Sequence, residues 1–253
     1  MKRLADRFGE AAASCASMSA LRALLADASA ELGFRWFALL HHASLRDMGQ
    51  RYIRIDNYPE AWTAEFIGGA LYRDDPVHRA SRRACGGFAW SELRSLTRLG
   101  RKQMWILERS RRFGLGDGMT VPVNVPGEPG GSCSFAVGTG AELPRQRLHC
   151  AELVGIQAFA AARRLLGLPF PNRRPHLNRR ELQCLRLAAA GKTDREIGII
   201  LGISTETARH YVKRARAAYD VVTRTQLVVL GLRDDWISFD EALDPRGLDP
   251  SRG

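Results

Sequence analysis

Apolar residues follow two different spacings along the first two-thirds of the chain. They recur at helical spacing in residues 19–32, 60–72 and 148–165. Shorter runs rich in aromatic and β-branched residues, typical of strands, lie between these segments. The predicted strands are residues 34–41, 51–55, 119–125 and 132–137. Strands grouped between helices favour an α+β fold, so we expect an α-β-α sandwich around a central antiparallel sheet.

A proline-rich segment, residues 168–176, follows the last of these helices. Three prolines within residues 168–175 cannot continue a helix, and the neighbouring arginines favour solvent. We interpret the segment as a linker between two domains, residues 1–167 and residues 177–253, the second ending in a short tail.

The second domain is predicted to be all helical, with four helices at residues 178–190, 193–201, 205–219 and 225–232. Three of the helix starts resemble capping boxes, in which a polar side chain and a Glu or Gln three residues later bond each other's backbone amides. The pairs are Asn178 with Glu181, Thr193 with Glu196, and Thr223 with Gln226. The tight turn 202–204 between the second and third helices is typical of a helix-turn-helix. Five apolar residues have the spacing to pack these two helices together: Ile197, Leu201, Ile203, Ala208 and Val212.

The third of these helices carries the candidate DNA chemistry. Arg209, Lys213 and Arg216 are spaced to share one helix face. The start of such a helix commonly meets base edges in the major groove, where Arg grips guanine and Lys holds phosphate. The alternative is a solvated basic face on a structural helix. The predicted DNA-binding residues are Thr193, Ser204, Thr205, Glu206, Thr207, Arg209, His210, Lys213 and Arg216.

The net charge of +11 favours anionic partners, nucleic acid before a membrane surface. Residues 171–236 hold 13 Lys and Arg against 7 Asp and Glu, a net +6. Arg outnumbers Lys, so an Arg-rich proteome is an alternative source of the charge.

Several classes of protein are disfavoured. The most apolar segment, residues 152–168, is interrupted by Arg163 and Arg164, and acidic residues near the N-terminus do not suit a signal peptide. Five cysteines without a CxxC pair argue against a disulfide framework or a zinc ribbon. The adjacent His41 and His42 would face opposite sides of a strand, so we expect no metal site. No GxSxG, HExxH or phosphate-loop motif occurs. We therefore expect a cytoplasmic protein that is neither an enzyme nor bound to a membrane.

Residues 177–231 resemble the DNA-binding domain of LuxR-type regulators. The matching residues are Glu181, Leu185, Gly191, the pair Glu196-Ile197 and the run GISTETARHYVKRARAAYDV. Ala208 stands where the family usually has Val.

Residues 51–137 resemble the quorum-sensing subgroup that binds N-acyl-homoserine lactones. The segments NYPEAWTAEF, RDDPV and FAWSEL keep that subgroup's spacing, and Gly118 also fits.

This resemblance implies a small-molecule effector, no cofactor, and a site whose residues suit an acylated lactone. The Asp75 carboxylate would accept the ligand's amide N–H, and the Trp62 indole would donate to the lactone carbonyl. Tyr58 and Ser134 would donate to the acyl carbonyl, and Trp90 would form a flat wall. Phe66 replaces the family's usual Tyr and so lacks a hydroxyl. The predicted ligand-binding residues are Tyr58, Trp62, Phe66, Asp75, Pro76, Trp90 and Ser134.

Helix-turn-helix proteins usually read two half-sites as dimers, so we expect a homodimer on a two-fold symmetric duplex DNA site. The apolar helix 225–232 must bury its side chains, within its own domain or against a second copy, and is a candidate dimer contact. Other interpretations stay open. The tryptophans suit an ordinary core, and Asp75 before Pro76 suits a helix cap. The regulator would then respond to another small molecule or to none. A phosphorylation-controlled regulator is disfavoured because Asp74-Asp75 does not end an apolar strand. An enzyme with a DNA-binding appendage lacks a catalytic constellation.

Overall fold

The computed structural model describes residues 2–42, 52–126, 128–168 and 174–243. The chain forms two compact units, Met1–Leu168 and Pro169–Gly253, each described separately below. Most of the expected linker, and the tail from residue 244 on, lie outside the described residues.

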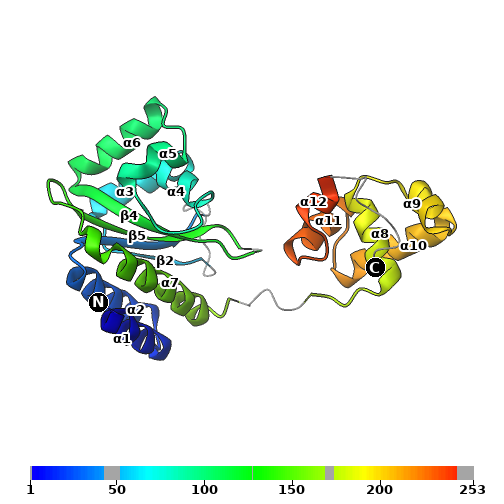
Figure 1. The fold of residues 1–253 in the computed structure, drawn as a ribbon, viewed down its shortest axis with the longest axis horizontal. Helices are drawn as coiled ribbons and strands as arrows, with labels where there is room; N and C mark the ends of the chain where they lie inside the picture. The colour runs from blue at the N-terminus through cyan, green and yellow to red at the C-terminus, as the bar shows by residue number, and fades with distance from the viewer. Residues whose placement is uncertain (1, 43–51, 127, 169–173, 244–253) are drawn as a thin grey trace. The chain divides into compact units, whose positions relative to one another are not determined.

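A five-stranded sheet organises the first unit, and every neighbouring pair of strands is antiparallel (Figure 1). The strands lie in the order β2-β1-β5-β4-β3. They are β1 (Trp36–His41), β2 (Arg54–Asp56), β3 (Phe88–Ala89), β4 (Leu115–Val123) and β5 (Gly131–Gly138). The predicted central antiparallel sheet is confirmed.

Helices cover both faces of this sheet, so the predicted sandwich is also confirmed (Figure 1). One face carries α1 (Lys2–Ser14), α2 (Met18–Glu31) and α7 (Leu148–Leu165), the last preceded by η3 (Arg145–Arg147). The opposite face carries short elements: α3 (Glu60–Gly68), η1 (Leu71–Arg73), α4 (Pro76–Ser81), η2 (Trp90–Glu92), α5 (Leu93–Leu96) and α6 (Arg101–Arg112).

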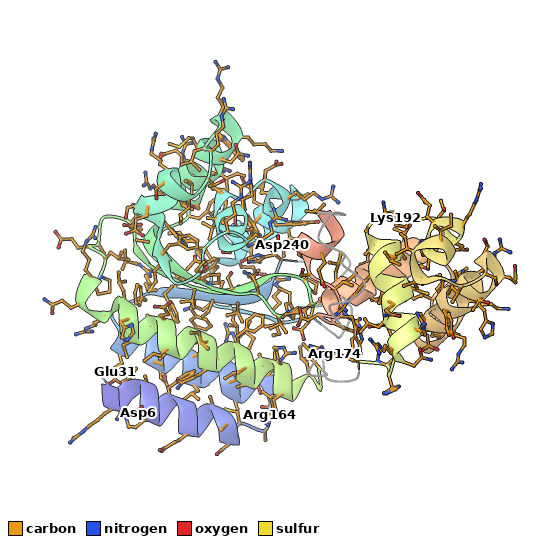
Figure 2. All side chains as sticks on the ribbon, turned by 45° about the vertical axis from the view of Figure 1, so that its right-hand side comes forward. Asp6, Glu31, Arg164, Arg174, Lys192 and Asp240 are labelled. Atoms are coloured by element: carbon orange, nitrogen blue, oxygen red, sulfur yellow. The ribbon has the colours of Figure 1, made fainter. Side chains whose placement is uncertain are left out.

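Strand alternation divides the side chains of the sheet between these two layers. Phe37 and Leu39 of β1 and Phe135 of β5 are fully buried in the core formed with α1, α2 and α7. Burying one such side chain contributes about 1.5–3 kcal/mol. At the end of this layer, the Arg164 guanidinium of α7 donates to the carbonyls of Ala12 and Cys15, which ties α7 to the end of α1 (Figure 2). The intervening strand residues point to the α3–α6 layer, where the cavity described below lies.

In this unit two predicted boundaries were wrong and two helices were missed. The helix expected over residues 60–72 ends at Gly68, and the chain turns through Ala70 at φ 52° before η1. Two consecutive glycines weaken the helix at this point. Helices α1 and α6 were not predicted; six of the twelve α6 residues are Lys, Arg or Glu, which obscures the apolar spacing. Strand β4 begins at Leu115, four residues earlier than expected.

The second unit contains α8 (Arg179–Ala189), α9 (Asp194–Leu201), α10 (Thr205–Ala218), α11 (Arg224–Arg233) and the short α12 (Phe239–Leu243). All three predicted capping boxes form, at Asn178, Thr193 and Thr223. The four predicted helices are confirmed, and α12 is additional. Ile197, Ala208 and Val212 are buried in one core, with Leu201 and Ile203 packed against it, as the spacing predicted.

None of the helices in the described ranges has both the length and the apolar character needed to cross a membrane.

Candidate functional site: a cavity and an exposed basic helix

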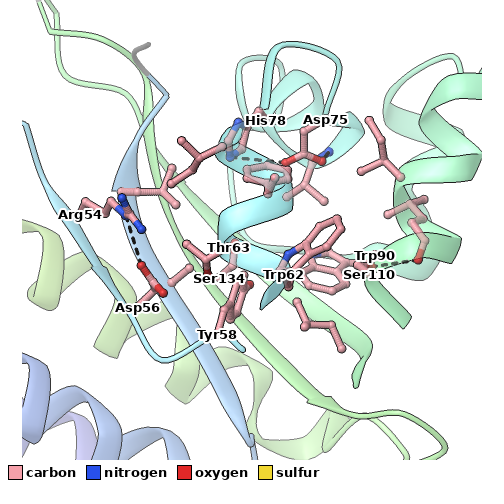
Figure 3. Close-up of a pocket in the computed structure, with 18 residues that line it drawn as sticks. Arg54, Asp56, Tyr58, Trp62, Thr63, Asp75, His78, Trp90, Ser110 and Ser134 are labelled. Carbon is pink, nitrogen blue, oxygen red and sulfur yellow. Dashed lines mark hydrogen bonds and ion pairs between the residues drawn. The ribbon is translucent and has the colours of Figure 1, made fainter. Parts of the chain in front are cut away.

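A cavity of about 80 Å³ lies between the sheet and the α3–α6 layer of the first unit (Figure 3). The chain brings together here six of the seven residues expected to bind ligand. They are Tyr58, Trp62, Phe66, Asp75, Trp90 and Ser134. Pro76 does not line the cavity. It occupies the first turn of α4, where its fixed φ and missing N–H suit a helix start.

The register of the sheet builds the floor of the cavity. Asp56 of β2, Ala38 of β1, Ser134 of β5 and Thr120 of β4 are cross-strand partners in one row. Residues paired in register share a sheet face, so this row faces the α3–α6 layer together. The floor therefore places the Ser134 hydroxyl beneath the helical residues that cover the cavity.

Trp90 is fixed to this floor by hydrogen bonds. Its indole N–H donates to the Thr120 hydroxyl at 2.9 Å, and that hydroxyl lies 2.8 Å from the Ser134 Oγ. Gly118 leaves room for the ring: a Cβ there would lie 3.0 Å from Trp90 and 2.6 Å from the carbonyl oxygen of Phe135. Trp90 therefore forms a positioned wall whose own N–H is already occupied.

Asp75 is both a helix cap and a cavity residue. Its Oδ1 accepts the backbone N–H of Val77 at 3.0 Å, which caps α4. Its Oδ2 lies 3.4 Å from Nε2 of His78. Burial raises the pKa of this carboxyl, opposed by His78 and by the backbone amides of Val77 and His78. Oδ1 is thus used to cap α4, and Oδ2 faces the His78 imidazole, which also lines the cavity.

Two donors predicted to bind ligand have no hydrogen-bond partner among the described residues: the Tyr58 hydroxyl and the Trp62 indole N–H. The Thr63 hydroxyl and the terminal amino groups of Arg54 also line the cavity without such a partner. Burial raises the pKa of Tyr58 well above its usual value, and the carboxylates of Asp75 and Asp56 raise it further. The phenol therefore keeps its proton and stays a donor. Trp62 is buried, with an exposed fraction of 4%, so its N–H also needs a partner.

Aromatic rings form the apolar wall beside these donors. The Trp62 ring centroid lies 5.4 Å from that of Phe66 and 5.7 Å from that of Phe113. Phe66 also meets His78 edge to face at 5.9 Å. The tryptophan thus belongs to a small hydrophobic cluster and also lines the cavity, so its place in the core is compatible with the predicted ligand role, which stays a prediction.

Sequence reasoning missed twelve of the lining residues. These are Ala38, Leu40, Arg54, Asp56, Thr63, Ile67, Val77, His78, Ile106, Leu107, Ser110 and Leu115. Strand alternation puts Arg54 and Asp56 on one face, but it does not say which face lies inward. His78 follows Asp75 by one helical turn, a spacing that could have suggested the contact. Its ring also stacks on that of His42 at 4.0 Å, a long-range pairing with no local signal.

In the second unit, a tight turn joins α9 to α10. Gly202 ends α9 at φ 65°, a conformation that favours glycine. Ser204 caps α10 by accepting the Thr207 N–H at 3.0 Å, and Thr193 caps α9 in the same way. Two predicted DNA-binding residues, Thr193 and Ser204, therefore also fix the ends of the two helices.

Helix α10 presents an exposed polar face. Its exposed residues from the predicted set are Thr205, Glu206, Arg209, His210 and Lys213. The Arg209 guanidinium lies 2.7 Å from Glu206 and 3.7 Å from Asp194, so its charge is partly paired. Lys213 forms no ion pair within the described part of the chain.

Two residues predicted to face DNA are less accessible than expected. Thr207 is half-buried beside the Ser204 cap. Arg216 is half-buried and donates to the carbonyl of Val222 in the turn before α11. The predicted basic face therefore keeps Arg209 and Lys213 exposed, whereas Arg216 is held by its own domain.

Comparison with known families decides what these two units are. Residues 17–165 match the autoinducer binding domain, and residues 175–230 match the bacterial regulatory proteins of the luxR family. The chain belongs to the LuxR family. This LuxR-type protein is a transcription regulator of the quorum-sensing type, with an autoinducer-binding domain before a helix-turn-helix DNA-binding domain.

Individual relatives agree with this assignment. The transcriptional activator BjaR1 of Bradyrhizobium diazoefficiens is 31% identical over 182 residues, which cover 70% of this chain and 72% of that protein. The HTH-type regulator y4qH of Sinorhizobium fredii is 26% identical over 209 residues, 80% of this chain but only 63% of that protein. Among solved structures, Escherichia coli SdiA matches with a TM-score of 0.61 at 22% identity, covering 94% of this chain and 97% of SdiA. The SdiA match shows the shared LuxR-type fold.

Proposed function

We propose that this LuxR-type regulator binds an N-acyl-homoserine lactone in the cavity of its first unit. The observation that carries the proposal is the meeting, in one cavity, of two unpaired donors, Tyr58 and Trp62, with the carboxylate of Asp75. An acylated lactone offers two carbonyl acceptors and one amide donor, which complements this set. The protein would act in the cytoplasm, where its DNA target lies.

Each polar group of the ligand has a partner in this arrangement. The Asp75 Oδ2 accepts the amide N–H, in competition with His78 at 3.4 Å. The Trp62 indole donates to the lactone carbonyl, and the Tyr58 hydroxyl, together with Ser134, donates to the acyl carbonyl. Trp90 and Phe66 enclose the ring and the start of the acyl chain. Pairing these buried groups avoids the desolvation cost that each would otherwise carry.

The size of the cavity indicates that binding rearranges its walls. Its volume of about 80 Å³ is well below the roughly 300–1,000 Å³ of typical small-molecule pockets. The walls of the cavity would therefore have to move apart to admit the ligand. Ligand binding would then change the packing of the domain, because the ligand would become part of its core.

Exposed apolar side chains support a homodimer. Leu153 and Ile156 on α7 are 38% and 47% exposed, and Val229 on α11 is 57% exposed. A second copy would cover such residues in each unit. Two copies would then present two α10 helices to the half-sites of a roughly two-fold symmetric DNA site.

A thermal-shift experiment on the full chain tests the ligand assignment. N-acyl-homoserine lactones of increasing chain length should raise the melting temperature, since a ligand at roughly 100 times its Kd stabilises by about 2.7 kcal/mol. Octanoyl-rac-glycerol, which was solved in complex with SdiA, is the comparison ligand. Recovery of the intact lactone by mass spectrometry excludes turnover. Stabilisation by the glycerol ester but by no lactone would contradict the proposed ligand class.

A further inference from the structure

The cavity holds polar chemistry that the lactone head group does not use. Arg54 and Asp56 line it from β2, on the side across from Trp62 and Trp90 (Figure 3). In the sheet register Arg54 pairs with Leu40, and Asp56 pairs with Ala38, two strand residues that also line the cavity. The sheet therefore fixes the backbone positions from which this charged pair reaches the cavity.

Arg54 has hydrogen-bond donors without a partner at this edge of the cavity. Its Nε lies 3.4 Å from Oδ2 of Asp56, a long contact, and its two terminal amino groups have no partner among the described residues. A guanidinium carries five N–H donors in a rigid fork. The side chains of Arg54 and Asp56 are 37% and 20% exposed, which places the pair at the edge of the cavity.

The imidazole of His78, which also lines the cavity, already has partners. His78 has its Nε2 3.4 Å from Asp75 and its Nδ1 3.3 Å from the carbonyl oxygen of Tyr72. Its ring is also stacked on His42. Apart from the Tyr58 hydroxyl, which is assigned to the acyl carbonyl, the unpaired donors on the β2 side of the cavity belong to Arg54.

If the ligand's amide meets Asp75 and its ring meets Trp62, the lining residues across the cavity, Leu40, Arg54 and Asp56, remain to meet the acyl chain. A plain aliphatic end would take water from the Arg54 guanidinium and offer no hydrogen bond in return, which is costly for a charged group. An oxygen at the end of the chain would replace that water.

We propose that the acyl group of the ligand carries a hydrogen-bond acceptor at its end far from the lactone, and that Arg54 donates to this oxygen. This inference rests on the proposed acyl-homoserine lactone function and adds the chemical class of the acyl group. Arg54 is then a specificity-determining residue.

The test compares matched ligands on the full chain by isothermal titration calorimetry. Each pair consists of an N-acyl-homoserine lactone and its ω-hydroxy analogue, with acyl chains of four, six and eight carbons. For the length that reaches Arg54, the ω-hydroxy ligand should bind about tenfold more tightly, the size expected for one hydrogen bond to a charged donor.

Variants separate the guanidinium from general effects. Arg54→Met keeps the aliphatic bulk and should reverse the preference in favour of the plain chain. Arg54→Lys should keep part of the wild-type preference for the ω-hydroxy ligand. Arg83→Met, at an exposed position outside the cavity, should leave the preference unchanged.

The outcomes distinguish this inference from the function on which it rests. If the wild type binds plain lactones as tightly as their ω-hydroxy analogues at every length, the acyl-end inference is wrong and the lactone function stands. A preference that survives in Arg54→Met also overturns it. If no lactone of either kind binds, both proposals fail.

Discussion

Asp75→Asn is expected to weaken binding of an acyl-homoserine lactone by about 10- to 100-fold, the range for losing a hydrogen bond to a charged group. The reason is that the two carboxylate oxygens have different roles: Oδ1 caps α4, and Oδ2 is proposed to accept the ligand's amide N–H. An Asn can keep its oxygen on the Val77 N–H and cap α4, but its amide NH₂ would then face the ligand's amide N–H. Two donors would oppose each other where the wild type pairs a donor with an acceptor. Isothermal titration calorimetry measures the change directly.

The neighbouring Asp74 supplies the matched control. Asp74 is ion-paired with Lys102 at 2.5 Å and does not line the cavity. Asp74→Asn should therefore bind ligand as the wild type does. Both variants should melt within a few degrees of the wild type without ligand, because the α4 cap survives. Equal losses in the two variants, or none in Asp75→Asn, would refute the role given to Asp75.

Arg209→Ala is expected to reduce affinity for the specific DNA site by about 10- to 100-fold, since a bidentate Arg–guanine contact contributes about 1–3 kcal/mol of discrimination. Arg209 is exposed near the start of α10 and is paired only at its surface, with Glu206 and Asp194. Those pairs can open at little cost when DNA offers better acceptors. Fluorescence anisotropy with the specific site and with a scrambled duplex measures the loss, and ligand affinity should not change.

Lys213→Ala distinguishes base reading from phosphate contact. Lys213 lies one turn further along α10 and is exposed. Its loss should weaken binding to both duplexes alike. The plot of log affinity against log salt should become less steep, its slope falling in magnitude by about one. If Arg209→Ala instead weakened both duplexes equally, Arg209 would be a phosphate contact and the assignment of base reading to it would be wrong.

Local sequence signals predicted the elements whose boundaries depend on local chemistry. Residues 148–165 match α7 at both ends, because its apolar face is continuous. Asn178, Thr193 and Thr223 form the caps that their capping-box patterns predicted. Elements that depend on packing against the rest of the domain were missed. The charged α6 is a helix because Ile106 and Ser110 are buried against the rest of the domain.

The cavity could be predicted only in part for the same reason. The spacing of Tyr58, Trp62, Asp75 and Trp90 indicated a shared site, and the structure gathers them in one cavity. The sheet register, which no short segment encodes, decides that Arg54 also faces inward. Likewise, the hydrogen bond from Arg216 to the Val222 carbonyl depends on the turn after α10, so helical periodicity alone could not predict that this residue is half-buried.

The most direct measurement is the affinity of the full chain for its DNA site, with and without a saturating acyl-homoserine lactone, in the wild type and in Asp75→Asn. Filling the cavity should change the DNA Kd of the wild type by about fivefold or more, the lower end of typical coupling between two sites. With the lactone at only a few times its wild-type Kd, the variant should show a much smaller change than the wild type. An unaltered DNA Kd in wild-type protein that calorimetry shows to be loaded with lactone would contradict the account.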